Sequence, residues 1–405
     1  MPNELEKYGV KKVGRLKDFR CPAPFRDFMV FDKSTSVCCP EWYDIDKLME
    51  DFPDDFDNKE PDFAWQVSKL KGTKVLENWN NPFHKKLRET IGKGDYKYCS
   101  LMCPWLNKIN SASQIDLENE FYKGDRSQNK NHTLEYYEKH LAHLTLPENV
   151  YFNFDTSCNL KCPSCRVDMR TNKMNIGNEK ILDAIDNQMG EGIKNITITG
   201  SGDPFYSNIF RKWLSTPKED KYPNLQEIFI VSNGNMFTPK IWEACKPSHK
   251  YINGMEWSID AGTKETYENK TRLNGRWDKL MENMDFLKSI KFPKRKAGGW
   301  GGGGLTFSFV MQTDNYKEIP IFRDLINSKF AGSHEKISIV YRAIQDWGHQ
   351  SKEWMKNANI CDPTHPKHDK FLEEFYKVSG DHNVISNVFH LLDEDKAKIS
   401  YNNLI

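Results

Sequence analysis

Three cysteines in one short stretch constrain this chain more than any other feature. Cys158, Cys162 and Cys165 follow the pattern C-x3-C-x2-C, directly after a strand-like run at residues 150–154. Cysteines this close together can converge on one inorganic centre without a long loop having to close. Three thiolates on a cubane of iron and sulfide leave one iron open, and an open metal position is where chemistry takes place. The spacing alone leaves two alternatives open, a structural zinc loop and a redox-active thiol pair.

The overall charge excludes some classes of partner. Lys and Arg number 58 and Asp and Glu number 57, so the formal net charge is +1. This balance gives no electrostatic footprint for nucleic acid or for an anionic membrane. No apolar run is long enough for a transmembrane helix, and the first residues are charged where a signal peptide is apolar. We therefore expect a cytoplasmic protein whose 10 cysteines are reduced metal ligands rather than disulfides.

Strand-like runs alternate with helical patterns over residues 149–348, which predicts parallel βα units and an α/β fold. The predicted strands lie at residues 150–154, 195–199, 227–232, 254–259, 305–311 and 336–340.

The cysteine pattern at the end of a first strand resembles the signature of the radical SAM superfamily. The resemblance implies a partial (β/α)6 TIM-like barrel at residues 149–348, in which Cys158, Cys162 and Cys165 hold a [4Fe-4S] cluster. It implies that S-adenosylmethionine (SAM) fills the open iron and is cleaved to a 5′-deoxyadenosyl radical, which abstracts hydrogen from a substrate. The electron for this cleavage would come from an external donor such as flavodoxin or ferredoxin.

The ends of the later strands carry residue types that match the SAM-binding motifs of that family. Ser201 replaces the second glycine of a Gly-Gly-Glu motif, and Asp203 lies near its acidic position. Glycines permit a close approach of the backbone to a ligand, and the guanidinium of Arg272 suits the SAM carboxylate. The cofactor-binding residues that the resemblance implies are Gly200, Ser201, Gly202, Asp203, Ser232, Asn233, Ser258, Asp260, Arg272, Gln312 and Asn315.

A second set of cysteines lies in the first 110 residues. A predicted β-hairpin has cysteines at both bases, and a later helix at residues 82–91 precedes two more. The pattern resembles the SPASM domain, an α+β module that binds auxiliary [4Fe-4S] clusters. The resemblance implies one auxiliary cluster, hence two clusters in all, with Cys21, Cys38, Cys99 and Cys103 as ligands. Cys39 is the alternative to Cys38, and a zinc ribbon on the same four cysteines is the alternative to a cluster.

This region departs from the SPASM pattern in its order along the chain, because that domain normally follows the barrel. The predicted organisation is a SPASM-like domain at 1–110, a connector with a linking helix at 111–148, the barrel at 149–348 and a helical extension at 349–405. Within the extension we expect amphipathic helices at residues 371–378 and 384–392.

Three residues are candidates for a catalytic role. Cys245 and Cys361 are spare thiols that could return a hydrogen atom to a substrate radical, as could Cys39, although a spare cysteine is usually a small buried hydrophobe. Trp300 lies in the glycine-rich loop 298–304, which is either a flap over the substrate or a flexible surface loop.

Two substrate classes agree with the resemblance. One is a carbohydrate-like small molecule, dehydrogenated or epimerised, and the other is a ribosomal peptide that acquires a crosslink, an epimer or a thioether. We expect the SPASM-like part to stand in the place of a separate N-terminal peptide-recognition domain, which slightly favours the small molecule. A non-catalytic iron–sulfur electron carrier is the hypothesis from a different class.

Overall fold

The structure is a computed structural model that describes residues 20–39, 42–52, 70, 72–100, 103, 133–171, 176–198, 201–293, 304–334, 336–388 and 391–392. It divides into two compact units. The first unit comprises Met1–Phe154, Ile176–Ile196 and Glu219–Leu225, and the second comprises Asp155–Asn175, Thr197–Lys218 and Gln226–Ile405. Each unit is described below by itself. None of the helices in the described part of the chain is long and apolar enough to cross a membrane.

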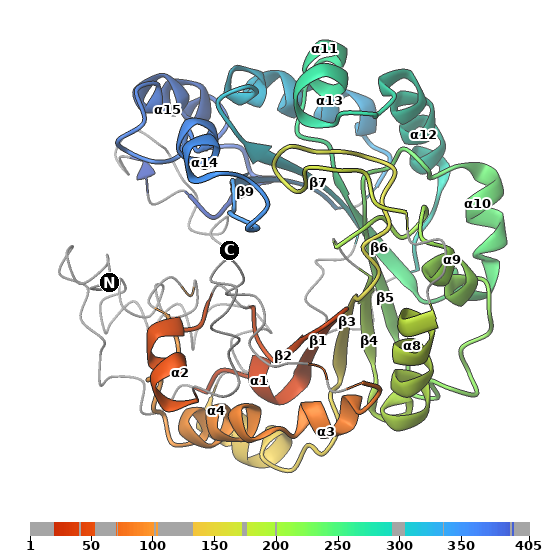
Figure 1. Ribbon diagram of the computed structural model, residues 1–405. Coiled ribbons are helices and arrows are strands. Elements are labelled where there is room, and N and C mark those ends of the chain that lie inside the picture. Colours follow the sequence, from red (N-terminus) through yellow and green to blue (C-terminus); the bar gives the residue numbers. More distant parts are fainter. Residues whose placement is uncertain are drawn as a thin grey trace. The chain divides into compact units, whose positions relative to one another are not determined.

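The fold is a mixed α/β fold with a largely parallel sheet of nine strands (Figure 1). The order is β2-β1-β3 in the first unit and β5-β6-β7-β8-β9 in the second, and β4 has residues in both. All six predicted strands are present, as β3 to β8, which agrees with a partial barrel. The strands are β1 Asp27–Phe31, β2 Thr35–Ser36, β3 Asn149–Asn153, β4 Asn195–Ile198, β5 Glu227–Ser232, β6 Ile252–Ser258, β7 Gly304–Met311, β8 Ile337–Ala343 and β9 Val384–Ser386.

The predicted N-terminal hairpin is confirmed, but it also belongs to the sheet, which the sequence did not predict. Strand β1 pairs antiparallel with β2 and parallel with β3, where Asp27 lies opposite Asn149. The side-chain amide of Asn149 donates to the carboxylate of Asp27 at 2.6 Å. The hairpin is therefore the edge of a larger sheet in the first unit rather than an isolated ribbon.

Helix α4 (Pro82–Gly92), predicted at residues 82–91, supports the hairpin from one side. Its N-cap Asn81 accepts the backbone N–H of His84, which satisfies one of the free donors of the first turn. Leu87 and Ile91 are buried, and the Arg88 guanidinium lies 4.5 Å from the centre of the Trp79 ring. The other helices of this unit are α1 Ala23–Arg26, α2 Ile45–Asp51, α3 Val75–Trp79, α7 Leu134–Tyr136, η6 Tyr137–Leu141, α8 Ile176–Gln188 and η7 Gly190–Gly192.

Parallel strands β6, β7 and β8 build the centre of the second unit, and their two faces differ. One face is apolar: Phe309 and Tyr341 pack against Phe322 of α13 (Ile319–Phe330), with ring centres 5.1 and 6.2 Å away. Leu280 and Met284 of α12 (Trp277–Ser289) are also fully buried. The remaining helices of the unit are α9 Asn208–Leu214, α10 Pro239–Ala244, η8 Lys246–Ser248, α11 Lys264–Thr266, η9 Tyr267–Thr271, η10 Tyr316–Glu318, α14 Lys352–Ala358 and α15 His368–Tyr376.

The C-terminal region confirms one predicted helix and corrects another. The helix expected at 371–378 is α15, but residues 384–386 form strand β9 instead of the first turn of a helix. Strand β9 pairs parallel with β8, and the backbone N–H of Ile339 donates to the carbonyl of Asn383 at 2.8 Å. Val384 and Ile385 are β-branched and fit the pleated edge of β8. The hydrogen bonds between β8 and β9 outweigh the helical periodicity of residues 384–392.

Candidate functional site

The loop that carries the three cysteines, residues 158–165, is held by backbone hydrogen bonds from two other segments of the second unit. The N–H of Cys158 donates to the carbonyl of Arg170 at 2.8 Å, and the N–H of Lys161 donates to the carbonyl of Leu273 at 2.9 Å. Asn274 adds a bond from its side-chain amide to the carbonyl of Asn159 at 2.8 Å. We call residues 158–165 the cysteine loop.

Asp155 fixes the entry to the cysteine loop, although the sequence analysis did not single it out. Its carboxylate is completely buried and accepts the N–H and the hydroxyl of Ser157 at 3.0 and 2.7 Å. The other carboxylate oxygen accepts the hydroxyl of Ser207, the N-cap of α9, at 2.5 Å. An acidic residue three positions before the first cysteine was the available signal.

Gly202 is required by packing against the same entry segment. A Cβ atom at this position would lie 2.4 Å from the carbonyl oxygen of Ser157 and 2.6 Å from that of Asp155. The sequence analysis attributed this glycine to a close approach of a ligand. The structure shows a close approach of the chain's own backbone.

Each cysteine of the loop has a hydrogen-bond donor close to its sulfur atom. The sulfur of Cys158 accepts the N–H of Leu160 at 3.5 Å and the side-chain amide of Asn233 at 3.7 Å. Asn233 was predicted to bind cofactor, and it lies directly against the first cysteine. Such bonds orient the ligands of an iron–sulfur centre and tune it.

Arginines contact the other two cysteines. A guanidinium nitrogen of Arg272 lies 3.3 Å from the sulfur of Cys162, and one of Arg166 lies 3.5 Å from the sulfur of Cys165. Burial raises the pKa of Cys162, and the Arg272 guanidinium partly reverses this shift. The Arg272 charge therefore favours the thiolate form of Cys162, which is the form that binds metal.

Arg272 is positioned by the π-helix η9 (Tyr267–Thr271) and by an aspartate. Its backbone N–H donates to the carbonyl of Tyr267 at 2.8 Å, which closes the wide last turn. Its guanidinium forms an ion pair with Asp260 at 2.8 Å and donates to the carbonyl of Ile259 at 3.3 Å. Asp260 has a φ of 59°, an unusual backbone conformation for a residue other than glycine, directly after β6.

Arg166 has a different environment, and the sequence analysis missed it. It is 6% exposed, and it donates to the carbonyls of Thr156 and Ser201 at 2.9 Å each. Its contacts are thus two carbonyls and the sulfur of Cys165, with no carboxylate among the contacts that the described residues make. An arginine immediately after the last cysteine was the signal in the sequence.

Asp203 supports the neighbouring strand end. It is 1% exposed, and its two oxygens accept the hydroxyl of Ser232 and the backbone N–H groups of Asn233, Phe205 and Tyr206 at 2.8 to 3.1 Å. Burial raises the pKa of this carboxyl, although these hydrogen bonds oppose the shift. Four donors fill the acceptor positions of a carboxylate, so Asp203 orients Ser232 and Asn233.

The last predicted cofactor residues meet beyond the ends of β6 and β7. Asn315 accepts the N–H of Gln312 at 2.7 Å and donates to the carbonyl of Asp260 at 2.9 Å. The Gln312 side-chain amide nitrogen is buried and has no hydrogen-bond partner among the described residues. The hydroxyl of Ser258 lies 2.9 Å from that of Ser308. This buried amide could donate a hydrogen bond to a polar ligand at the site.

The described cofactor candidates thus form two groups in the second unit. Ser201, Gly202, Asp203, Ser232 and Asn233 lie beside Cys158 and Arg166, whereas Asp260, Arg272, Gln312 and Asn315 lie on the side of Cys162.

The remaining predicted residues are less informative. Gly200 and Trp300 lie outside the described residues. Cys245 and Cys361 are buried, and burial raises the pKa values of their thiols to about 11 and about 12. Both thiols are therefore protonated at neutral pH.

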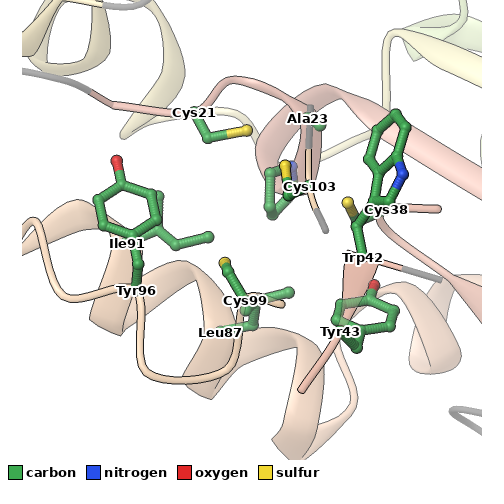
Figure 2. A pocket seen from close by; sticks show the side chains of 11 residues that line it. Cys21, Ala23, Cys38, Trp42, Tyr43, Leu87, Ile91, Tyr96, Cys99 and Cys103 are labelled. Atoms are coloured by element: carbon green, nitrogen blue, oxygen red, sulfur yellow. The ribbon is translucent and has the colours of Figure 1, made fainter. Parts of the chain in front are cut away.

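The other four predicted ligands line one pocket in the first unit, which we call the four-cysteine pocket. Figure 2 shows the sulfur atoms of Cys21, Cys38, Cys99 and Cys103 facing the space between them. Neighbouring Cys39 does not line this pocket. The other lining residues are mostly apolar or aromatic: Ala23, Pro24, Trp42, Tyr43, Leu87, Ile91 and Tyr96.

Backbone bonds bring the two halves of this pocket together. Tyr43 and Cys99 form an isolated antiparallel bridge, and the N–H of Ser100 donates to the carbonyl of Trp42 at 2.8 Å. The cysteines after α4 are therefore joined to the segment that follows the hairpin.

The thiols of the four-cysteine pocket disfavour one another's ionisation. Burial raises the pKa of Cys38 well above its usual value, and the charges of Cys21, Cys103, Cys39 and Cys99 raise it further. Burial likewise raises the pKa of Cys21. Four adjacent thiolates would need a positively charged centre to neutralise them.

Across the described residues, no three or more His, Cys, Asp or Glu side chains are arranged to hold one metal ion. Ligands of one zinc ion lie about 2.3 Å from it, whereas the cysteines of a cubane bind separate irons and stand farther apart.

Comparison with known proteins places the cysteine loop within a recognised domain. Residues 152–320 match the model of the Radical SAM superfamily. No curated protein sequence matches the chain. Among solved structures, native anSMEcpe with bound AdoMet matches with 14% sequence identity and a TM-score of 0.39. The match covers 57% of this chain and 59% of that one, so the chain spans less than two thirds of that protein's length.

The matched range includes the cysteine loop and all the described cofactor candidates, from Ser201 to Asn315. The [4Fe-4S] cluster and SAM are therefore the cofactors that the family implies for this site. Residues 152–320 are a radical SAM superfamily domain.

Proposed function

We propose that the chain is a radical SAM enzyme in which Cys158, Cys162 and Cys165 hold a [4Fe-4S] cluster. The observation that carries this proposal is the cysteine loop itself. Its three thiols share one short segment within the matched domain, and each has an N–H donor at its sulfur. With cluster and SAM bound, one electron from an external donor would cleave SAM to methionine and a 5′-deoxyadenosyl radical, which takes a hydrogen atom from substrate.

The chain's own residues would bind and orient SAM. Gln312 presents a buried amide donor without a partner, and Ser258 presents a half-buried hydroxyl at the end of β6. Asp203 orients Ser232 and Asn233 through hydrogen bonds of 2.8 Å. These contacts support roles for the two strand ends as polar walls of the cofactor site.

The four-cysteine pocket would hold an auxiliary [4Fe-4S] cluster. Its four thiols would satisfy every iron, so this cluster would accept an electron from the substrate radical or position the substrate, and not bind SAM. Cys38 lines the pocket and Cys39 does not, which favours Cys38 as the fourth ligand.

The substrate we propose is a small, polar, carbohydrate-like molecule that is dehydrogenated or epimerised. The face of β6, β7 and β8 opposite the apolar one supports this choice. Glu256 lies in register with Thr306 and Ser338 on that face, and its carboxylate pairs with both terminal nitrogens of Arg342 at 2.5 and 3.1 Å. Charged and hydroxyl groups on one face suit a substrate rich in hydroxyl groups.

SAM cleavage is the first test. Reconstituted, dithionite-reduced protein should convert SAM to 5′-deoxyadenosine, measured by chromatography and mass spectrometry, and Cys158→Ala protein should not. Iron-loaded wild-type protein that forms no 5′-deoxyadenosine would overturn the enzyme proposal and favour an electron carrier.

Iron counting tests the auxiliary cluster. Wild-type protein should hold about eight irons per chain and the Cys158/Cys162/Cys165→Ala triple variant about four. A triple variant without iron, beside a wild type with about four, would show that the first unit carries no cluster.

Deuterium transfer tests the substrate class. A deuterated monosaccharide or aminocyclitol that is a substrate should yield 5′-deoxyadenosine heavier by one deuterium. Transfer from a deuterated peptide and from none of the small molecules would favour the peptide alternative.

A further inference from the structure

We infer that Arg166 and Arg272 set the reduction potential of the cluster held by the cysteine loop. Arg166 is its main counter-charge, and Asp260 weakens the effect of Arg272 on the potential. This inference rests on the proposed cluster at Cys158, Cys162 and Cys165. It concerns two positioning residues, because each acts through a cysteine sulfur.

The first step is the location of the two charges. Both guanidinium groups are buried, at 6% and 8% exposure, and both donate to a cysteine sulfur, at 3.5 Å for Arg166 and 3.3 Å for Arg272. Hydrogen bonds to the sulfurs, net charge and solvent exposure are the factors that set the potential of an iron–sulfur cluster. Water screens buried charges much less than exposed ones, so the charges of these arginines strongly affect the cluster.

The second step is the difference between the arginines. Arg272 is already paired with Asp260 at 2.8 Å, which cancels part of its field at the cluster. The described contacts of Arg166 are the carbonyls of Thr156 and Ser201 and the sulfur of Cys165. A buried guanidinium without a carboxylate partner is costly, and a negatively charged cluster on the cysteine loop would supply the missing anion.

The third step is the sign. Reduction adds a negative charge to the cluster, so a nearby positive charge stabilises the reduced form and raises the potential. Loss of Arg166 should therefore lower the potential most, and loss of Arg272 should lower it less. Loss of the negative charge at Asp260 frees the field of Arg272 and should raise the potential.

The test is an EPR-monitored redox titration of full-length, anaerobically reconstituted protein without SAM. The signal of this cluster is the one that the Cys158/Cys162/Cys165→Ala variant lacks. Arg166→Gln should reduce the ratio of reduced to oxidised cluster about tenfold at a fixed potential, which is about 59 mV for one electron. Arg272→Gln should reduce it about threefold, and Asp260→Asn should increase it about threefold.

Two kinds of control separate charge from structure. Arg166→Lys keeps the charge and should restore most of the potential that Arg166→Gln loses. Arg323, which pairs with Asp381 at 2.6 Å, is an arginine of the same unit that contacts no cysteine, and Arg323→Gln should leave the potential unchanged. Asn is well tolerated at positive φ, so Asp260→Asn should retain the backbone of the site.

Unchanged potentials in iron-replete Arg166→Gln and Arg272→Gln proteins would overturn the inference. If Arg166→Gln protein does not retain the cluster, the potential of Asp260→Asn protein tests the inference instead. An electrostatic role predicts that this variant has a higher potential than wild type, and an unchanged or lower potential would overturn the inference. A wild type without this EPR signal would instead refute the proposed cluster. A normal titration without SAM cleavage would refute the proposed activity and leave this inference standing.

Discussion

The two cysteine sites of this chain differ in the charges that surround their thiols. In the second unit, three cysteines lie within one loop and two arginines contact their sulfurs. In the first unit, the cysteines of the four-cysteine pocket come from before and after the hairpin and from beyond α4, and apolar and aromatic side chains surround them.

The difference shows in the ionisation of the thiols. Arg272 lowers the pKa of Cys162 against the effect of burial, whereas the neighbours of Cys38 are other thiols that raise its pKa further. The sulfurs of Cys162 and Cys165 therefore have positively charged neighbours, whereas the charges that act on Cys38 are those of four other thiols.

The largest expected effect is at the cysteine loop. Cys158→Ala should lower 5′-deoxyadenosine formation by more than about a thousandfold, because the open iron exists only when three thiolates hold the cluster. The free energy of unfolding of the first unit should not change. Appreciable SAM cleavage by the variant would remove Cys158 from the ligand set.

Loss of a cysteine from the four-cysteine pocket should change the iron content and the thermal stability of the first unit. Cys99→Ala should cost about four irons per chain and lower the thermal stability of the first unit, because metal binding contributes directly to folding. The matched control is Cys39→Ala, a change to the cysteine adjacent to Cys38 that should keep all the iron. Iron loss in Cys39→Ala with retention in Cys38→Ala would reverse the ligand assignment.

Gly202 tests the close backbone contact at the entry to the cysteine loop. Gly202→Ala should lower the free energy of unfolding by about 1 to 3 kcal/mol in urea titrations, since its Cβ would overlap the Ser157 carbonyl. Gly177 in α8 has no atom near its virtual Cβ, so Gly177→Ala should instead stabilise by about 0.4 to 1 kcal/mol. Equal effects of the two substitutions would show that the contact at Gly202 is easily relieved.

The last expected effect is an acid sensitivity of the first unit. His84 is fully buried in α4, and burial lowers its pKa to about 3 from an ordinary value near 6.5. A base with a depressed native pKa stabilises the fold above its unfolded pKa, and that stability is lost as the pH falls from 6.5 towards 3. The loss should approach about 1.4 kcal/mol per pH unit within this window. His84→Gln should abolish this slope in chemical unfolding measured from pH 7 to 4.5, and an unchanged slope would contradict the assignment.

Local patterns in the sequence predicted much of the fold. Strands β3 to β8, helix α4 and the hairpin were all visible, because alternation, caps and turn residues act over a few positions. The parallel pairing of β1 with β3 was not visible, because nothing in either strand specifies a partner so distant. Strand β9 was assigned to a helix because its pairing with the edge of β8 outweighs a weak local periodicity.

In the site, too, local patterns could be predicted from the sequence and contacts between distant residues could not. Spacing identified the cysteine loop, but not Arg166, whose role depends on the carbonyls of Thr156 and Ser201 folding back onto it. Asp203 was chosen for its charge, and its four internal donors became apparent only in three dimensions.

The pairing of β1 with β3 has a consequence for biosynthesis. Asp27 and Asn149 are 122 positions apart, so β1 can pair only with β2 until the ribosome has made β3. Helices and turns form early, whereas such distant pairing forms late. The next residues to emerge after β3 are those of the cysteine loop. During translation, the strand that pairs with β1 and the three cysteines of the cysteine loop therefore emerge within a few residues of each other. If this loop holds the proposed cluster, the cluster can be inserted only after this point.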